Sequence, residues 1–306
     1  MAAFIARRLL QGAATMLGVA ILVFGLLHLS GDPALVMSSP DATPEQIEQL
    51  RHALGLDRPL PVQLAIYLER LAQGDLGQSL RFNRPVAGLI LERLPNTLEL
   101  TLAAMLVAVT VALPSGIAAA IHRGERLDRL LMAGALAGQA IPIFWLGLML
   151  VRVFAVDLKL LPVYGQGGIE HLVLPSLTLA TVVVGRLARL TRSCMLDVLG
   201  REYIRTARAK GLSEWRVLVV HALRTAAIPI VTLLGLQLAQ LLGGAVVTET
   251  IFAWPGVGSL VVEAVFNRDF PTVQGITLVV SAIFVLVNLA VDLSYAALDP
   301  RVRLGA

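Results

Sequence analysis

The chain has 306 residues, of which 57% are hydrophobic and 15% are charged, with a mean hydropathy of +0.77 and a formal net charge of +4. A soluble domain of this composition would expose far too much apolar surface, so the sequence excludes a soluble globular protein and predicts an all-α integral membrane protein. The single cysteine, Cys194, excludes an internal disulfide and a thiolate metal cluster.

The first apolar run, 9–29, follows Arg7 and Arg8. A secretory signal is the alternative, but 21 apolar or weakly polar residues exceed the usual hydrophobic region of about 7–15, and no small-x-small cleavage pattern precedes Ser30. We therefore interpret residues 1–30 as an N-terminal tail and a retained first transmembrane helix.

Residues 31–96 have a composition of their own and predict a small external subdomain. The segment opens with Gly-Asp-Pro at 31–33 and holds a helix-like run over 43–54. Thr43 as N-cap, Pro44 at the first helical position and Gln46 three residues after the cap form a near capping box. The subdomain either shapes the outer mouth or meets a partner there, or it is a solvated loop packed on the helix ends.

Residues 97–299 form the predicted transmembrane core. Four charge-free runs are long enough to cross a hydrocarbon core, which takes about 20 helical residues; they are 100–121, 130–151, 225–248 and 270–291. A shorter run, 171–185, spans only if Arg186 and Arg189 extend their side chains to the interface. Together with the first helix, this predicts six transmembrane helices and a cytoplasmic tail at 300–306.

The distribution of Lys and Arg predicts which side each loop faces. Nine of these residues fall in 186–225, against one in 157–171 and one in 248–274. Because positively charged loops stay in the cytoplasm, we expect both termini to be cytoplasmic. The basic balance is then explained by topology, and no nucleic-acid partner is expected.

A polar, arginine-rich stretch, 201–229, lies between two apolar segments. It predicts a helix, a break at Gly211, Ser213 as N-cap and a second helix, because glycine readily ends a helix and serine can accept from an open N–H. A cytoplasmic loop of this kind predicts a docking surface for a soluble partner.

Motifs for catalysis are missing from the sequence. Lys159 and Lys210 are followed by Leu and Gly, so neither fits the GxxxxGK[ST] loop of a P-loop ATPase. There is no HExxH or GxSxG motif, and the histidines are scattered, at His28, His52, His122, His171 and His221. We therefore expect no catalytic residues, no metal site and no cofactor bound by this chain.

Polar residues recur at helical spacing in the last two predicted spans. One line consists of Gln237, Gln240, Gly244 and Thr248, and the other of Thr277, Ser281, Phe284, Asn288 and Asp292. Unsatisfied polar groups are costly in hydrocarbon, so both lines must face protein or water. They either line a translocation path, for which we select Gln237, Gln240, Gly244, Thr248, Ser281 and Asn288, or form hydrogen bonds between helices.

Charged residues near the span ends have a simpler interpretation. Arg152 and Asp157 can pair at the interface, and Glu99 and Asp292 lie near opposite faces on different helices. This spacing disfavours a proton relay, although an autonomous ion-coupled transporter or channel stays an alternative of a different class. Pro142 and Pro229 are expected to bend or begin their helices.

Several strings resemble those of one family over essentially the whole chain. They are RRLLQGAATMLGVAILVFGLLHLSGDPA, LGLDRPLPVQ, GDLGQSLRFNRPV, LPNTLELTLA, IPIFWLGLML, LPSLTL, TRSCMLDVL, ETIFAWPGVGSLV and YAALDPRVR. In order and spacing they resemble the integral-membrane permease subunits of bacterial ABC importers, in the dipeptide, oligopeptide and nickel branch. The resemblance implies a six-helix type I permease fold with a cytoplasmic coupling helix.

The family's cytoplasmic signature is Glu-Ala-Ala, three residues, Gly, nine residues and Ile-x-Leu-Pro. Aligned on Gly211, this chain keeps Ala207 and Leu223. It departs from the signature at Arg205, Thr206, His221 and Arg224, and Glu202 is not at the position of the signature glutamate. Within the coupling loop 192–225, the resemblance assigns ATPase coupling to Arg205, Thr206, Ala207, Arg208, Lys210, Gly211 and Leu223.

The resemblance also implies partners and a mechanism. Two ATP-binding subunits that use ATP and Mg would drive alternating access through the 201–212 helix, because only differential affinity for two states shifts their populations. A second homologous permease, an external substrate-binding protein and the lipid bilayer of the bacterial cytoplasmic membrane complete the expected assembly.

Residues 30–96 and 248–270 would form the outer mouth, with the turn at Trp254, Pro255 and Gly256 ending the fifth span. An aromatic interface anchor is a compatible interpretation of Trp254. For the substrate, the amide and hydroxyl lining favours a small peptide, with glutathione and nickel as alternatives.

Overall fold

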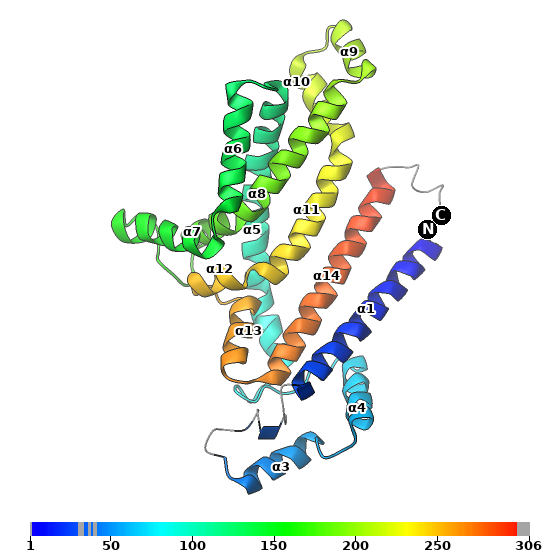
Figure 1. The fold of residues 1–306 in the computed structure, drawn as a ribbon, viewed down its shortest axis with the longest axis vertical. Coiled ribbons are helices and arrows are strands. Elements are labelled where there is room, and N and C mark those ends of the chain that lie inside the picture. Colours follow the sequence, from blue (N-terminus) through cyan, green and yellow to red (C-terminus); the bar gives the residue numbers. More distant parts are fainter. Residues whose placement is uncertain (1, 30–33, 36–37, 39–41, 299–306) are drawn as a thin grey trace. The chain divides into compact units, whose positions relative to one another are not determined.

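The computed structural model describes residues 2–29, 34–35, 38 and 42–298. The Gly-Asp-Pro sequence at 31–33 and the predicted tail at 300–306 therefore lie outside the described residues. The described residues are helical apart from the connecting segments, in which Gln78 and Pro85 form an isolated antiparallel bridge. An all-α fold is thus confirmed (Figure 1).

The chain divides into two compact units, which are described separately. Unit 1 comprises 1–95 and 256–285, and unit 2 comprises 96–255 and 286–306. Both α5 (Val86–Ile121) and α14 (Phe270–Leu298) contribute residues to each unit. The predicted division into an external subdomain and a transmembrane core stays a prediction.

Unit 1 also contains α1 (Ala2–Leu29), α3 (Pro44–Leu54), α4 (Leu60–Ala72) and α13 (Val257–Phe266). The predicted capping box begins α3, because Gln46 N–H donates to Thr43 Oγ1 and Thr43 N–H donates to Gln46 Oε1. The core of the unit joins three helices through Val86, Leu89 and Ile90 of α5, Val257 and Leu260 of α13, and Ile276 of α14.

Unit 2 is built around α8 (Ile169–Leu199), which packs against α6 (Arg126–Ala140), α7 (Ile143–Leu150) and α11 (Arg224–Gly244). The remaining elements are the π-helical η1 (Val151–Asp157), α9 (Glu202–Ala209), α10 (Glu214–Arg216), the π-helical η2 (Val217–Leu223) and α12 (Val246–Ile251). Leu179, Val183 and Leu187 of α8 are fully buried in the main core.

Five helical segments are long and apolar enough to cross a membrane. They are Ile5–Leu29, Val86–Ile121, Ile169–Leu199, Glu214–Gly243 and Phe270–Leu293. The predicted short run at 171–185 is thus part of a 31-residue helix. The predicted span at 225–248 starts earlier, at Glu214, and its helix is interrupted at Ala245, where α11 passes into α12.

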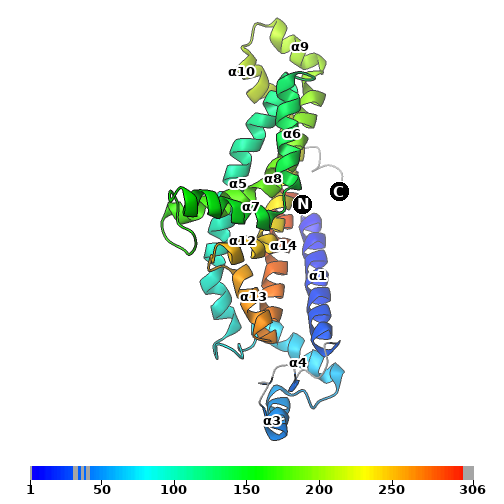
Figure 2. The ribbon, with the colours of Figure 1, turned by 60° about the vertical axis from the view of Figure 1, so that its left-hand side comes forward.

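The third predicted span, 130–151, is not one straight helix. Its residues form α6 and the α7–η1 segment, which meet at a bend of 99°. Ile141 has an extended backbone, with ψ of 126°, and Pro142 has no N–H to continue the helical hydrogen bonds. Figures 1 and 2 both show α7 running across the direction of α8. Pro142 begins a helix as predicted, whereas Pro229 lies inside α11.

Glycines allow α8 to approach its neighbours closely. A Cβ built on Gly116 of α5 would lie 2.6 Å from the Ala188 carbonyl oxygen, and one on Gly185 of α8 would lie 2.5 Å from the Ala135 carbonyl oxygen. Both obstacles are backbone atoms, which cannot rotate away. The close approach of the helices therefore requires glycine, which has no side chain, at both positions.

Gly116→Val is therefore expected to destabilise the protein by about 3 kcal/mol, the upper range for overpacking a core. The measurement is thermal unfolding of the purified protein in detergent. Gly134→Val in α6 is the matched control, because a Cβ there meets nothing within 4 Å. Equal stability of the two variants would contradict the close-approach interpretation.

Candidate coupling surface and polar path

Helix α9 is anchored to unit 2 by one apolar face. Ile204 is fully buried and Ala207 is 7% exposed, and both belong to the main core together with Met195, Val198 and Val217. Tyr203 extends the attachment, because its hydroxyl donates to Thr225 Oγ1 at 3.0 Å. One face of this short helix is therefore packed onto the helices beneath it.

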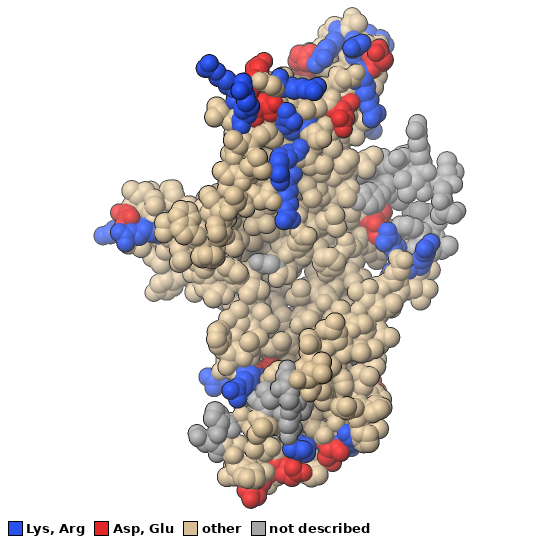
Figure 3. Space-filling model, in the orientation of Figure 1, with Lys and Arg blue, Asp and Glu red and all other residues tan. Residues whose placement is uncertain are grey.

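The other face of α9 is polar and exposed. Arg205 forms an ion pair with Glu202 at 3.2 Å, and the Thr206 hydroxyl donates to the Glu202 carbonyl oxygen at 3.1 Å. Arg208 donates to both carboxylate oxygens of Glu214 at 2.8 and 3.2 Å. Figure 3 shows basic and acidic side chains gathered at the end of the molecule that carries α9.

The turn after α9 depends on the backbone of Gly211. Lys210 is the C-cap, and Gly211 has φ of +73°, a region in which side chains with a branched Cβ are strained. The Gly211 N–H donates to the Arg208 carbonyl oxygen at 2.9 Å. A Cβ at Gly211 would meet nothing within 4 Å, so the requirement is conformational rather than steric.

The segment after the break differs from the prediction in one respect. Ser213 occupies the N-cap of α10 with an extended backbone, but its side chain makes no capping hydrogen bond. The capping function predicted for the Ser213 hydroxyl is therefore wrong, and the ion pair between Arg208 and Glu214 joins the two sides of the break instead. Leu223, the last residue of η2, is partly buried against the main core.

Trp215 is a surface residue that the sequence analysis did not single out. It is 75% exposed, directly after Glu214. A large exposed aromatic beside a polar ion pair is typical of residues that anchor protein interfaces. Its occurrence in a polar, arginine-rich loop was the available sequence signal.

Two of the predicted path residues meet at one arginine. Arg186 Nη1 lies 3.2 Å from both Gln237 Oε1 and Gln240 Oε1, and donates to each. Gln237 is 2% exposed, and its amide nitrogen has no hydrogen-bond partner among the described residues. The structure thus joins α8 and α11 through a cationic centre inside two candidate spans.

A second arginine of α8 is also bound within the protein. Arg189 Nη2 donates to Gln139 Oε1 at 2.6 Å, and its Nε donates to the Gly185 carbonyl oxygen at 3.1 Å. Both arginines are thus exposed side chains that bind amide oxygens of neighbouring helices, and their extension to the membrane interface stays a prediction. Amide oxygens on neighbouring helices satisfy the guanidinium groups, which avoids the cost of leaving them bare in hydrocarbon.

The other path residues are placed as follows. Gly244 is the last residue of α11, and Thr248 is fully buried in α12, with a hydroxyl that has no partner among the described residues. Both Ser281 in unit 1 and Asn288 in unit 2 are half-buried residues of α14. Their role in a path stays a prediction.

The predicted mouth residues form the turn between α12 and α13. Trp254 is 1% exposed and its indole N–H donates to the Asn96 carbonyl oxygen at 2.9 Å, so it is a core residue and not an interface anchor. Asn96 Nδ2 in turn donates to the Pro255 carbonyl oxygen at 2.8 Å. Gly256 is the N-cap of α13. Nearby, the fully buried Glu249 accepts from the Thr97 hydroxyl at 2.7 Å.

A buried ion pair near the start of α6 was also missed from the sequence. Asp128 accepts from Arg192 Nε at 2.6 Å and Nη2 at 2.7 Å, in a two-point contact between α6 and α8. The Gly124 N–H donates to the same carboxylate at 2.9 Å. Arg192, Arg189 and Arg186 recur every three residues along α8. Figure 3 shows a run of basic side chains extending into an otherwise uncharged surface.

Two family descriptions match the chain. Residues 112–304 match the binding-protein-dependent transport system inner membrane component, and residues 1–101 match the N-terminal part of the membrane component of such systems. The chain belongs to this family. It is therefore the membrane permease subunit of an ABC importer, a multi-pass protein of the inner membrane, and the ATPase activity lies in separate subunits.

Curated relatives match the permease along its length. The glutathione transport system permease protein GsiC of Salmonella typhimurium strain LT2 is 46% identical over 301 residues, which is 98% of each chain. The protein of the same name from Escherichia coli strain K12 is 45% identical over 301 residues, with the same coverage.

A solved structure shares the fold. The inward-facing MetNI methionine ABC transporter contains a chain that matches with a TM-score of 0.59 and 21% identity, covering 70% of the permease and 97% of that chain. This likeness confirms the predicted ABC importer permease fold.

Proposed function

We propose that the permease forms half of a translocation path for a small anionic peptide of the glutathione class. The observation that carries the proposal is the arginine cluster of α8, with Arg186 held between Gln237 and Gln240. An ionisable side chain inside a transmembrane segment is costly and is kept for a function. A guanidinium beside amide groups suits a peptide that carries carboxylates.

The names of the relatives favour glutathione over other peptides. At neutral pH glutathione carries two carboxylates and one ammonium group, so a cationic path attracts it. Two relatives that are 45 and 46% identical to the permease are described as glutathione transport permeases. We therefore propose glutathione ahead of the dipeptides and oligopeptides that the sequence favours, and ahead of nickel.

The proposed assembly has two permease chains, of which the second is a homologous subunit, two ATP-binding subunits and an external substrate-binding protein. ATP and Mg are used by the ATP-binding subunits, and this chain binds no cofactor of its own. The exposed face of α9 and Trp215 would dock on the ATPase. Because α9 shares the core of α8 and η2, movement of the ATPase dimer would shift the spans between two states.

The proposal is tested with an arginine variant. Arg186→Leu is expected to lower glutathione uptake by about tenfold, the loss of one charge-assisted interaction. The measurement is uptake by proteoliposomes that contain the full complex, its binding protein and ATP. Arg152→Leu is the matched control, because Arg152 is exposed and pairs with Asp157 outside the cluster.

A neutral dipeptide distinguishes the possible substrates. If Arg186→Leu leaves glutathione uptake unchanged, or if the wild-type complex imports neutral dipeptides or nickel but no glutathione, the proposed substrate class is wrong. Flux through the lone permease without ATPase subunits would instead support an autonomous transporter.

A further inference from the structure

Unit 1 contains a cavity that the proposed transport function does not use. It has a volume of about 230 Å³ and lies among α1, α3, α4 and the start of α14. Phe24, Leu27 and His28 line it from the last turns of α1, and Gln274 lines it from the first turns of α14. Since both helices are candidate spans, the cavity lies at the end of two spans, where lipid headgroups meet water.

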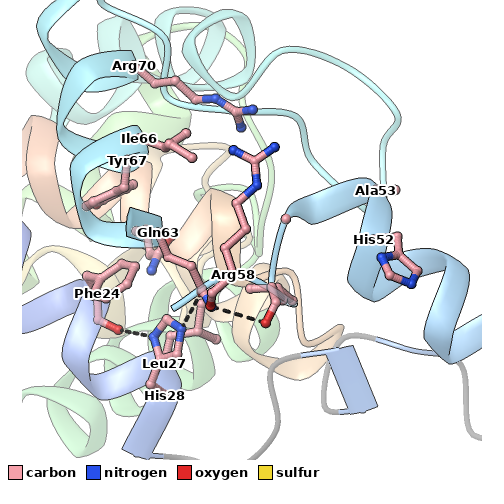
Figure 4. Close-up of a pocket in the computed structure, with 13 residues that line it drawn as sticks. Phe24, Leu27, His28, His52, Ala53, Arg58, Gln63, Ile66, Tyr67 and Arg70 are labelled. Atoms are coloured by element: carbon pink, nitrogen blue, oxygen red, sulfur yellow. Dashed lines mark hydrogen bonds between the residues drawn. The ribbon is translucent and has the colours of Figure 1, made fainter. Parts of the chain in front are cut away.

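Two arginines, Arg58 and Arg70, face this cavity, and the nearby Asp57 carboxylate interacts with Arg58 only at a longer range than an ion pair. Figure 4 shows the guanidinium groups of Arg58 and Arg70 pointing toward one another. Neither group has an ion pair or side-chain hydrogen bond with any residue that the structure describes. Like charges that converge in this way repel each other, and an anion placed between them removes the repulsion and gains charge-assisted hydrogen bonds.

The rim of the cavity is held in place by hydrogen bonds. Gln63 Nε2 donates to the carbonyl oxygens of Leu56 at 3.1 Å and Arg58 at 2.7 Å, and Gln63 Oε1 accepts from His28 Nε2 at 2.9 Å. His28 Nδ1 lies 2.9 Å from the Phe24 carbonyl oxygen. These contacts fix the backbone at Arg58, so this side of the cavity is formed before a ligand arrives (Figure 4).

Tyr67 also lines the cavity. Its hydroxyl is buried away from solvent and has no hydrogen-bond partner among the described residues. Burial raises the pKa of Tyr67 to about 12, so the hydroxyl keeps its proton.

A separate apolar groove lies further along α1, α4 and α14. It has a volume of about 550 Å³, and every residue that lines it is apolar, including Met16 and Leu17 of α1, Leu68 and Leu71 of α4, and Leu278 of α14. Along α1 the lining passes from Phe24 to Ala20, and along α14 from Gln274 to Leu278. Each step is one helical turn, about 5.4 Å, further into the candidate span.

We infer that unit 1 holds an anionic glycerophospholipid, with its phosphate between Arg58 and Arg70 and an acyl chain in the groove beside Leu17 and Leu278. A soluble anion would use the cavity but not the groove, and an uncharged lipid would use the groove but leave the guanidinium groups of Arg58 and Arg70 without an ion pair. An anionic lipid matches both surfaces and their order along the spans. The inference is independent of the transported substrate.

The test is native mass spectrometry of the delipidated full complex with added lipids. Phosphatidylglycerol is expected to bind at least tenfold more tightly than phosphatidylethanolamine. Arg58→Gln and Arg70→Gln should each weaken phosphatidylglycerol binding about fivefold, from the contribution of one basic residue to anionic-lipid attraction. Arg81→Gln is the matched control, because Arg81 is exposed in the same unit but does not line the cavity.

The groove has its own matched pair. Ala13→Phe would fill it, whereas Ala14→Phe changes a neighbouring exposed residue that does not line it, so only the first should weaken binding. A photoactivatable phosphatidylglycerol should label residues 60–72 in the wild-type complex. Glycerol phosphate that competes as strongly as the lipid would overturn the inference in favour of a soluble anion. Equal binding of both lipids, or binding unaffected by Arg58→Gln, Arg70→Gln and Ala13→Phe, would also overturn it.

Discussion

Replacing Asp128 by asparagine is expected to destabilise the permease clearly more than the loss of an exposed surface charge, because it removes the carboxylate that pairs with Arg192. The Asp128 side chain is 5% exposed and that of Arg192 is 28% exposed. The substitution also weakens the acceptor for the Gly124 N–H. The free energy of unfolding in detergent measures the effect.

Glu125→Gln is the control for the Asp128 variant. Glu125 is the exposed N-cap of α6 and its side chain makes no capping hydrogen bond, so the change should stay within about 0.5 kcal/mol. Adding Arg192→Met to Asp128→Asn should recover part of the free energy of unfolding, because the double variant has no arginine left without its carboxylate partner. Equal effects of the Asp128 and Glu125 variants would contradict a structural role for the pair.

Gly211→Val is expected to reduce transport by at least tenfold while the complex still hydrolyses ATP. Holding a β-branched residue at φ of +73° costs about 1–2 kcal/mol of conformational free energy. The turn therefore adopts another conformation, and the orientation of α9 relative to η2 changes. Uptake and ATP hydrolysis are measured on the same proteoliposomes. Gly211→Asn is the matched control, because asparagine tolerates the left-handed region. Wild-type uptake by the Val variant would refute the coupling assignment.

The structure explains why the chain retains some positions of the coupling signature and departs from it at others. The signature positions that this chain retains are Ala207, which is packed in the core, Gly211, which needs a positive φ, and the partly buried Leu223. The departures at Arg205 and Thr206 are exposed. The retained positions determine the shape of the loop, and the exposed ones are free to match a particular partner.

The spans were predictable from the sequence because length and apolarity alone decide whether a helix can cross a bilayer. The broken third span was not, although Pro142 marked the position, since the chain around the break is apolar on both sides. A hydropathy profile reports burial in lipid and carries no information on helix direction.

The polar contacts of the candidate site were the least predictable part. Arg186 is separated by 51 and 54 residues from Gln237 and Gln240, and Arg192 by 64 residues from Asp128. No local pattern links such residues, so the arginines were assigned to the interface by their position near the end of an apolar run. Only the packing of α8 against α6 and α11 identifies their partners.

The segment around the 99° bend between α6 and α7 determines whether the chain crosses the membrane an even or an odd number of times. If the two short helices together traverse the bilayer once, the chain makes an even number of passes, and the start of α1 and the end of α14 share one aqueous compartment. If they dip in and return, the number is odd and those ends are separated by the lipid. The change of helix direction at Ile141 and Pro142 therefore bears on the sidedness of the whole polypeptide.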